Sequence, residues 1–89
     1  MPSVSRFLGI VIKMYFDEGE QHHLPHLHAE YAGDEAVFNI DTGEKIAGKF
    51  PPKQTLFVQT WVLLHQEELM ENWKLVSADK PIIKIKPLR

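Results

Sequence analysis

The sequence predicts an α+β fold in which an antiparallel sheet of about four strands packs against one long amphipathic helix. Residues 8–50 contain short β-branched and aromatic segments separated by turn signals, which is typical of strands. The turns at residues 32–34 and 41–44 are short enough to favour an antiparallel meander over a parallel sheet. From residue 53 to residue 78 the apolar spacing changes to the period of a helix.

The first strand is expected at residues 8–16, where the even positions are uniformly apolar and the odd positions are mixed. The even positions should therefore face the core. A short polar lead at residues 1–6 precedes this strand, and a long connection at residues 17–25 follows it. The other expected strands cover residues 26–31, 35–40 and 45–50.

One apolar stripe runs along the expected helix with i, i+3, i+4 and i+7 spacing. Its members are Val58, Trp61, Val62, His65, Leu69, Trp73 and Val76, and Phe57 and Leu64 widen it. We expect Trp61 and Trp73 to anchor the core, and His65 to be a core histidine with satisfied hydrogen bonds. Pro81 ends the helix. Residues 82–87 alternate isoleucine with lysine, which predicts a possible short C-terminal edge strand.

Length and composition indicate one small globular domain over residues 1–89. The chain has no cysteine, which excludes a disulfide framework and a thiolate metal site. Its net charge of -2 argues against an indiscriminate nucleic-acid binder. No segment approaches the roughly 20 apolar residues of a membrane helix, so we expect a cytoplasmic protein with no membrane partner.

Four of the five histidines lie in residues 22–31, around Pro25. Alternate side chains of a strand share a face, so His26, His28 and Glu30 should lie opposite Leu27 and Ala29. The long helix must cover one face of the sheet, and the other face should be open. By the same alternation, that open face should carry Lys13, Tyr15, His26, His28, Glu30 and Asn39.

Three interpretations of this segment follow from its residue types. His26 and His28 could be surface histidines that hydrogen-bond to their neighbours. They could instead bind a divalent metal together with Glu30 and His22, with His23 or Asp17 as further possible ligands. In the third interpretation one histidine is a general acid or base. Lys13 then stabilises developing negative charge, and Tyr15 and Glu30 assist. No cofactor other than this possible metal is indicated.

Several segments resemble a bacterial family catalogued as domain of unknown function 4160. They are residues 2–16, residues 25–31, residues 61–73 with Glu68-Leu69 and Asn72-Trp73, and residues 85–88. The resemblance runs nearly from end to end, although residues 22–25 depart from the Asn-Pro-Pro-like approach usual in the family. It implies a small stand-alone bacterial protein whose gene lies beside another small uncharacterised domain, as in a toxin–antitoxin pair. No agreed activity comes with the family.

Two functions are therefore expected. The first is a binding or regulatory module, one partner of a two-protein, toxin–antitoxin-like system, which binds a small protein or forms a homo-oligomer. The alternative is a small hydrolase or ribonuclease, with or without a metal ion, that acts on RNA through His26 and His28, with Tyr15, Lys13 and Glu30 in support.

Overall fold

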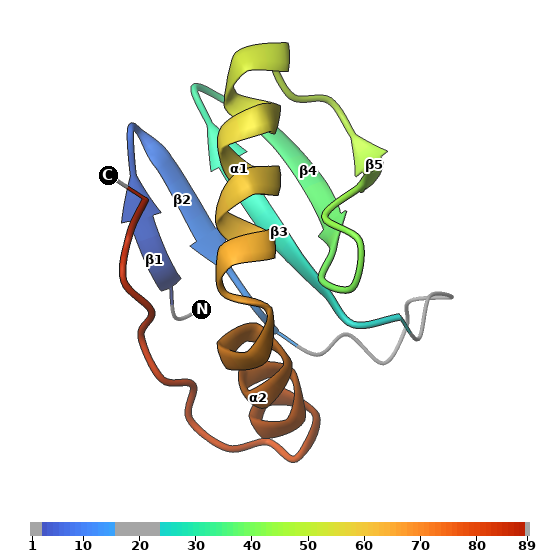
Figure 1. The fold of residues 1–89 in the computed structure, drawn as a ribbon, viewed down its shortest axis with the longest axis vertical. Helices are drawn as coiled ribbons and strands as arrows, with labels where there is room; N and C mark the ends of the chain where they lie inside the picture. Colours follow the sequence, from blue (N-terminus) through green and yellow to red (C-terminus); the bar gives the residue numbers. More distant parts are fainter. Residues whose placement is uncertain (1–2, 16–23, 89) are drawn as a thin grey trace.

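The computed structural model of the protein describes residues 3–15 and 24–88 (Figure 1). Within these residues, five strands form one antiparallel sheet in which each strand pairs with the next in sequence. Two helices follow the sheet. The elements are β1 (Ser3–Phe7), β2 (Ile10–Lys13), β3 (His26–Tyr31), β4 (Asp34–Asn39), β5 (Lys45–Gly48), α1 (Pro52–Leu64) and α2 (Gln66–Ser77).

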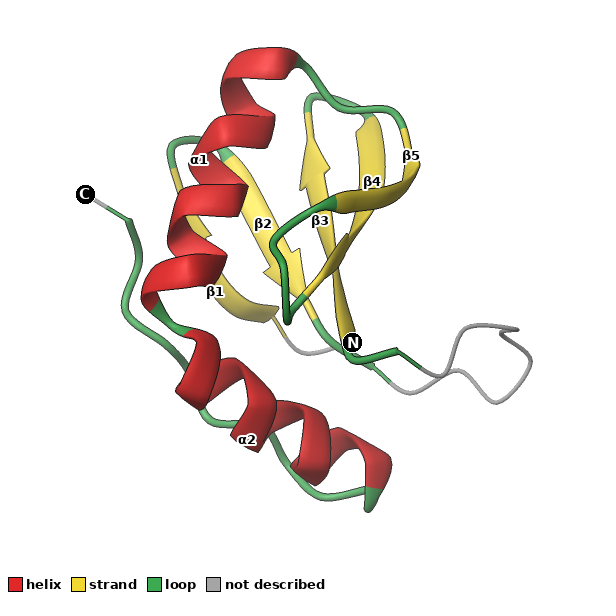
Figure 2. Cartoon of the chain, turned by 45° about the vertical axis from the view of Figure 1, so that its right-hand side comes forward, coloured by secondary structure: helices red, strands yellow, loops and turns green. Residues whose placement is uncertain are grey.

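Helix α1 covers one face of the sheet, and α2 continues past the end of the sheet (Figure 2). The residues buried between α1 and the sheet include Ile10, Ile12, Leu27, Ala29, Ala36, Phe38, Val58, Trp61 and Val62. The strand residues among them alternate along β2, β3 and β4, because successive strand side chains point to opposite faces. The prediction that Leu27 and Ala29 face the helix is confirmed, as is the α+β class.

The first predicted strand is wrong in its boundaries. Residues 8–16 do not form one strand, because β1 and β2 form a hairpin with Leu8 and Gly9 as its turn. These two residues have φ angles of 53° and 81°. Two successive positive φ angles are what a type I′ hairpin turn requires. The segment predicted as a polar lead thus contains most of β1, and the sheet has five strands rather than four within the described residues.

The one predicted helix is two helices in the structure. At His65 the backbone leaves helical geometry, with φ −125° and ψ 29°. The side-chain Nε2 of Gln66 donates hydrogen bonds to the carbonyls of Ile40, at 3.1 Å, and Asp41, at 2.7 Å, which ties the start of α2 to the end of β4. Leu64, expected in the core, is 65% exposed at this break. Neither helix of the described chain is long and apolar enough to cross a membrane.

The predicted edge strand at residues 82–87 does not form. One ladder-like hydrogen bond joins this tail to β1, from Ile85 N to Val4 O at 3.0 Å. The backbone of Ile83 forms its hydrogen bonds with the Asn72 side chain and not with a strand. Asn72 Nδ2 donates to Ile83 O at 2.7 Å, and Asn72 Oδ1 accepts from Ile83 N at 2.8 Å. The tail is therefore held mainly through side chains of α1 and α2, because the indole Nε1 of Trp61 also donates to Lys86 O at 2.8 Å.

The Leu8-Gly9 turn leads to a stability prediction. Replacing Leu8 with Asn should raise the free energy of unfolding by about 0.5–1 kcal/mol, because Asn adopts positive φ more readily than Leu. Little buried apolar area is lost, since Leu8 is 54% exposed. Urea unfolding measures the change. Leu8→Val is the control and should lower stability, because a β-branched residue is strained at positive φ. Equal stability of the two variants would contradict the assigned turn.

Candidate functional site

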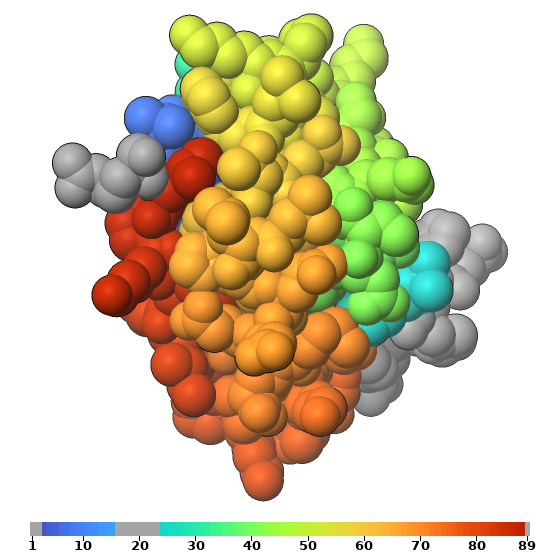
Figure 3. All heavy atoms as spheres, in the orientation of Figure 1, coloured from blue at the N-terminus to red at the C-terminus, as the bar shows by residue number. Residues whose placement is uncertain are grey.

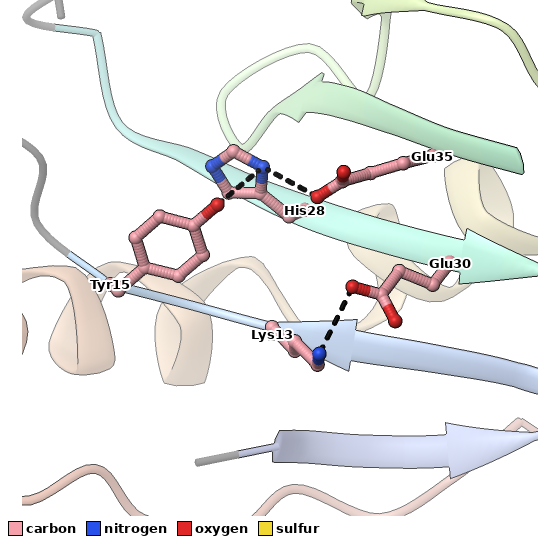
Figure 4. A network of polar contacts seen from close by, with 5 residues as sticks. All are labelled: Lys13, Tyr15, His28, Glu30 and Glu35. Carbon is pink, nitrogen blue, oxygen red and sulfur yellow. Dashed lines mark hydrogen bonds and ion pairs between the residues drawn. The ribbon is translucent and has the colours of Figure 1, made fainter. Parts of the chain in front are cut away.

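Five polar side chains gather on the face of the sheet opposite α1 (Figure 4). They are Lys13, Tyr15, His28, Glu30 and Glu35, and we call them the polar cluster. Lys13 lies on β2 with Tyr15 two residues beyond it, His28 and Glu30 lie on β3, and Glu35 lies on β4. The strand register places Lys13 opposite His28, and Glu30 opposite Glu35. Strand pairing therefore brings together four of the five residues predicted to be catalytic.

Basic and acidic side chains alternate diagonally within the polar cluster. Glu30 and Glu35 face each other across β3 and β4, and like charges in that position are destabilising. Each carboxylate has a nitrogen beside it, and the positive charge of Lys13 offsets part of this repulsion. Lys13 Nζ lies 3.0 Å from Glu30 Oε2, and His28 Nδ1 lies 3.5 Å from Glu35 Oε2. The Lys13–Glu30 pair is part-exposed, so its own contribution is about 0–1 kcal/mol.

His28 lies at the centre of the polar cluster and is only 6% exposed. The Tyr15 ring stacks on the imidazole, with ring centroids 4.3 Å apart and planes inclined by 16°. The Tyr15 hydroxyl lies 3.2 Å from His28 Nδ1, and the tautomer of His28 decides which group donates. The expectation that His28 is an exposed surface histidine is wrong, because the Tyr15 ring packs on it.

His26 has different surroundings from His28, although both lie on the same face of β3. It is 2% exposed, so the expectation of surface exposure is wrong here too. Its Nδ1 lies 2.7 Å from Leu24 O and donates to it, because a carbonyl oxygen only accepts. Its ring packs 4.9 Å from the ring of Trp73 on α2 and meets His28 edge-on at 5.4 Å. Helix α2 therefore covers His26 at the end of the sheet.

The other predicted helix residues also divide between core and surface. Trp61 is completely buried, as expected for a core anchor, whereas Trp73 is partly buried, packs against the core and also contacts the His26 ring. The side chain of His65 is 18% exposed, and its Nδ1 lies 2.7 Å from Glu68 Oε1.

Asn39 on β4, expected on the open face, accepts a hydrogen bond from Asp41 N at 2.7 Å. Its side chain stabilises the turn after β4.

The predicted metal ligands are only partly described. Residues 3–15 and 24–88 contain no group of three His, Cys, Asp or Glu side chains placed to hold a metal ion. The Glu30 carboxylate contacts Lys13, which competes with metal binding by this group. His22, His23 and Asp17 lie outside the described residues. The metal hypothesis for His26, His28, Glu30 and His22 therefore stays a prediction.

Sequence reasoning missed Glu35 as a member of the site. A signal was present, because the apolar residues Ala36, Phe38 and Ile40 place the odd positions of this strand on the open face. The tight turn before β4 then sets Glu35 opposite Glu30. The contact between His26 and Trp73 had no comparable signal, because it depends on the direction that α2 takes after the break at His65.

A hollow of about 400 Å³ adjoins the polar cluster. It lies where the β1–β2 and β3–β4 turns approach each other, and its lining includes Gly9, Val11, Glu30, Tyr31, Asp34 and Glu35. The side chains of Glu30 and Glu35 are 40% and 52% exposed. The two carboxylates are therefore the members of the cluster that a ligand or partner entering this hollow reaches first.

Residues 9–74 match the family described as Domain of unknown function (DUF4160). The chain belongs to this family. The matched residues run from Gly9 in the β1–β2 turn into α2, so they include the whole polar cluster and His26. The resemblance seen in the sequence is confirmed for most of the chain. No curated protein and no solved structure matches the chain in the corresponding comparisons.

The packing of His28 leads to a prediction that contrasts it with its cross-strand neighbour Lys13. His28→Gln should lower the free energy of unfolding by about 1–3 kcal/mol, because it removes a buried ring that stacks on Tyr15. Lys13→Gln should cost no more than about 1 kcal/mol, because the lost ion pair is part-exposed. Chemical denaturation of both variants at neutral pH measures the difference. Equal costs would contradict the buried position of His28.

Proposed function

We propose that this member of the family is a cytoplasmic binding or regulatory module, one partner of a two-protein, toxin–antitoxin-like system. The gene arrangement implied by the family resemblance supports the two-protein system. The observation that carries the proposal is the sheet face opposite α1. No described helix lies over the central part of this face, since α1 packs on the other side and α2 lies at the end where His26 begins β3 (Figures 1 and 2).

The chemistry of this face suits a small protein partner. Beside the polar cluster it carries Val11 and Val37, which are half-buried, and Ala47, which is exposed opposite Val37. The two valines flank the central strand β3, which carries His28 and Glu30 on this face. A mixture of polar and apolar groups is usual in protein interfaces that are not permanent. The alternating charges of the cluster already hold its side chains in place, so binding a partner costs less conformational entropy. The face is thus organised before a partner binds.

Co-expression with the product of the neighbouring gene tests this proposal. The two proteins should elute together from size-exclusion chromatography. Val37→Lys should weaken the complex at least about tenfold, because it replaces a half-buried apolar side chain next to His28 with a long, strongly hydrated cation. Lys74→Glu changes an exposed charge on α2 and serves as the matched control, with binding unchanged. Separate elution of the unmodified proteins, or equal binding by Val37→Lys, would count against the proposal.

A second candidate function is a small hydrolase or ribonuclease. The observation that favours it is the pair of groups on one ring nitrogen of His28, namely the Tyr15 hydroxyl at 3.2 Å and the Glu35 carboxylate at 3.5 Å. In this candidate the Tyr15 hydroxyl exchanges a proton between substrate and His28, while Glu35 balances the imidazolium charge. Lys13 supplies positive charge for an anionic transition state when a substrate displaces Glu30 from it. His26, edge-on to His28, positions that ring.

Cleavage of single-stranded RNA by the purified protein tests the second candidate. Tyr15→Phe keeps the stacked ring and removes the hydroxyl, so it should lower the rate by about 100-fold or more while the fold stays intact. His65→Gln alters a histidine at the junction of α1 and α2, away from the polar cluster, and should leave the rate unchanged. Equal rates for the parent and Tyr15→Phe would contradict the proton transfer through Tyr15, and equal rates for the parent and a His26→Ala/His28→Ala double variant would point to a contaminant.

A further inference from the structure

The outward surface of α1 is unusually apolar for a helix that covers a sheet. Leu56, Leu63 and Leu64 are 62%, 55% and 65% exposed, while Val58, Trp61 and Val62 on the inward side are buried. Figure 3 shows α1, in yellow and orange, uncovered at the middle of this face of the molecule. A group of exposed leucines on one helix marks an interaction surface more often than a solvated one.

The charges at the two ends of this surface are opposite in sign. Lys53, Leu56, Thr60, Leu63 and Glu67 follow one another at steps of three and four residues, so the first four share one side of α1 and Glu67 follows at the start of α2. Lys53, Thr60 and Glu67 are all exposed. The stripe is nearly symmetrical about Thr60: Leu56 lies four positions before it, Leu63 lies three positions after it, and a charged residue lies seven positions away at each end. Reversing its direction exchanges the lysine with the glutamate.

We propose that a second copy of this chain packs on α1, with the two α1 helices antiparallel and a two-fold axis at Thr60. Such an isologous contact requires a self-complementary surface, and the stripe is one. Leu56 of each copy meets the leucines at the other end of its neighbour's α1, and the small Thr60 side chain at the crossing lets the helices approach closely. Lys53 of each copy meets Glu67 of the other.

A hollow at the junction of α1 and α2 fits the incoming lysine. It has a volume of about 310 Å³, and its lining includes Leu63, Leu64, Glu67 and Glu68. A lysine stem packs well on apolar side chains while its ammonium contacts carboxylates. Lys53 of the second copy finds both kinds of group there. The break at His65 forms this hollow, so the junction between the helices takes part in the contact.

The charge pattern favours a second copy over a different partner. A basic partner would match only the Glu67 end of the stripe, and an acidic partner would match only the Lys53 end. A contact made by one helix from each copy is also small, so the dimer should be reversible, with a dissociation constant of about 1–100 µM. This surface lies on the opposite side of the sheet from the face used in the proposed function, so either proposal can fail without the other.

Sedimentation velocity over about 1 µM to 1 mM protein tests the dimer. The parent chain should shift from monomer to dimer as its concentration rises. Thr60→Glu should weaken the dimer at least about tenfold, because two carboxylates then meet at the axis. Ser77→Glu is the matched control, because Ser77 is an exposed hydroxyl residue at the far end of α2, ten positions after Glu67. A parent that stays monomeric throughout, or a dimer that Thr60→Glu leaves intact, would overturn the proposal.

Two further variants test the orientation of the helices. Lys53→Glu should weaken an antiparallel dimer several-fold, and adding Glu67→Lys should restore most of the affinity by exchanging the two charges. The absence of cysteine allows a second measurement. Thr60→Cys should form a disulfide-linked dimer under mild oxidation, whereas Glu71→Cys, exposed on α2, should not. No rescue by the double variant, or equal cross-linking of both cysteine variants, would contradict the antiparallel arrangement.

Discussion

The buried Trp61 side chain contacts β1, the junction of the two helices and the C-terminal tail, so it joins the tail and the helices to the sheet. The indole is completely buried, its ring packs 5.3 Å from the Phe7 ring of β1, and it lies 5.4 Å from His65 at the junction of the helices. Its Nε1 donates to Lys86 O, which holds the tail beside α1. Because a tail without strand pairing has few backbone partners, this hydrogen bond and the Asn72–Ile83 pair determine where it lies.

Local periodicity predicted the parts of the fold that depend on neighbouring residues. Alternation placed β3 and β4 correctly, because each buries one face against α1 and keeps polar residues on the other. It failed at Leu8-Gly9, because leucine is uncommon at a positive φ and the apolar run continues through the turn. It also failed at His65, where the apolar spacing continues and the break coincides with hydrogen bonds from Gln66 to the end of β4.

The candidate site likewise has a part that local periodicity predicted and a part that it did not. Strand alternation placed Lys13, His28 and Glu30 on one face, but it carried no information about burial. The rings of Tyr15 and Trp73 pack on His28 and His26, and Trp73 comes from α2, which begins only after the break at His65. Which face a residue occupies is a local property of a strand. What covers that residue is decided by elements distant in sequence.

The order of the strands has a consequence for how the chain folds during synthesis. Every strand pairs with its immediate neighbour in sequence, so each pair of strands can form as soon as its second strand is made, although the β2–β3 connection is longer than the others. The contact between Ile85 and Val4 is different, because it joins segments from opposite ends of the described chain. The tail is made after the strands and helices. A nascent chain can therefore assemble its sheet early, but Trp61 gains its carbonyl partner only when Lys86 has left the ribosome.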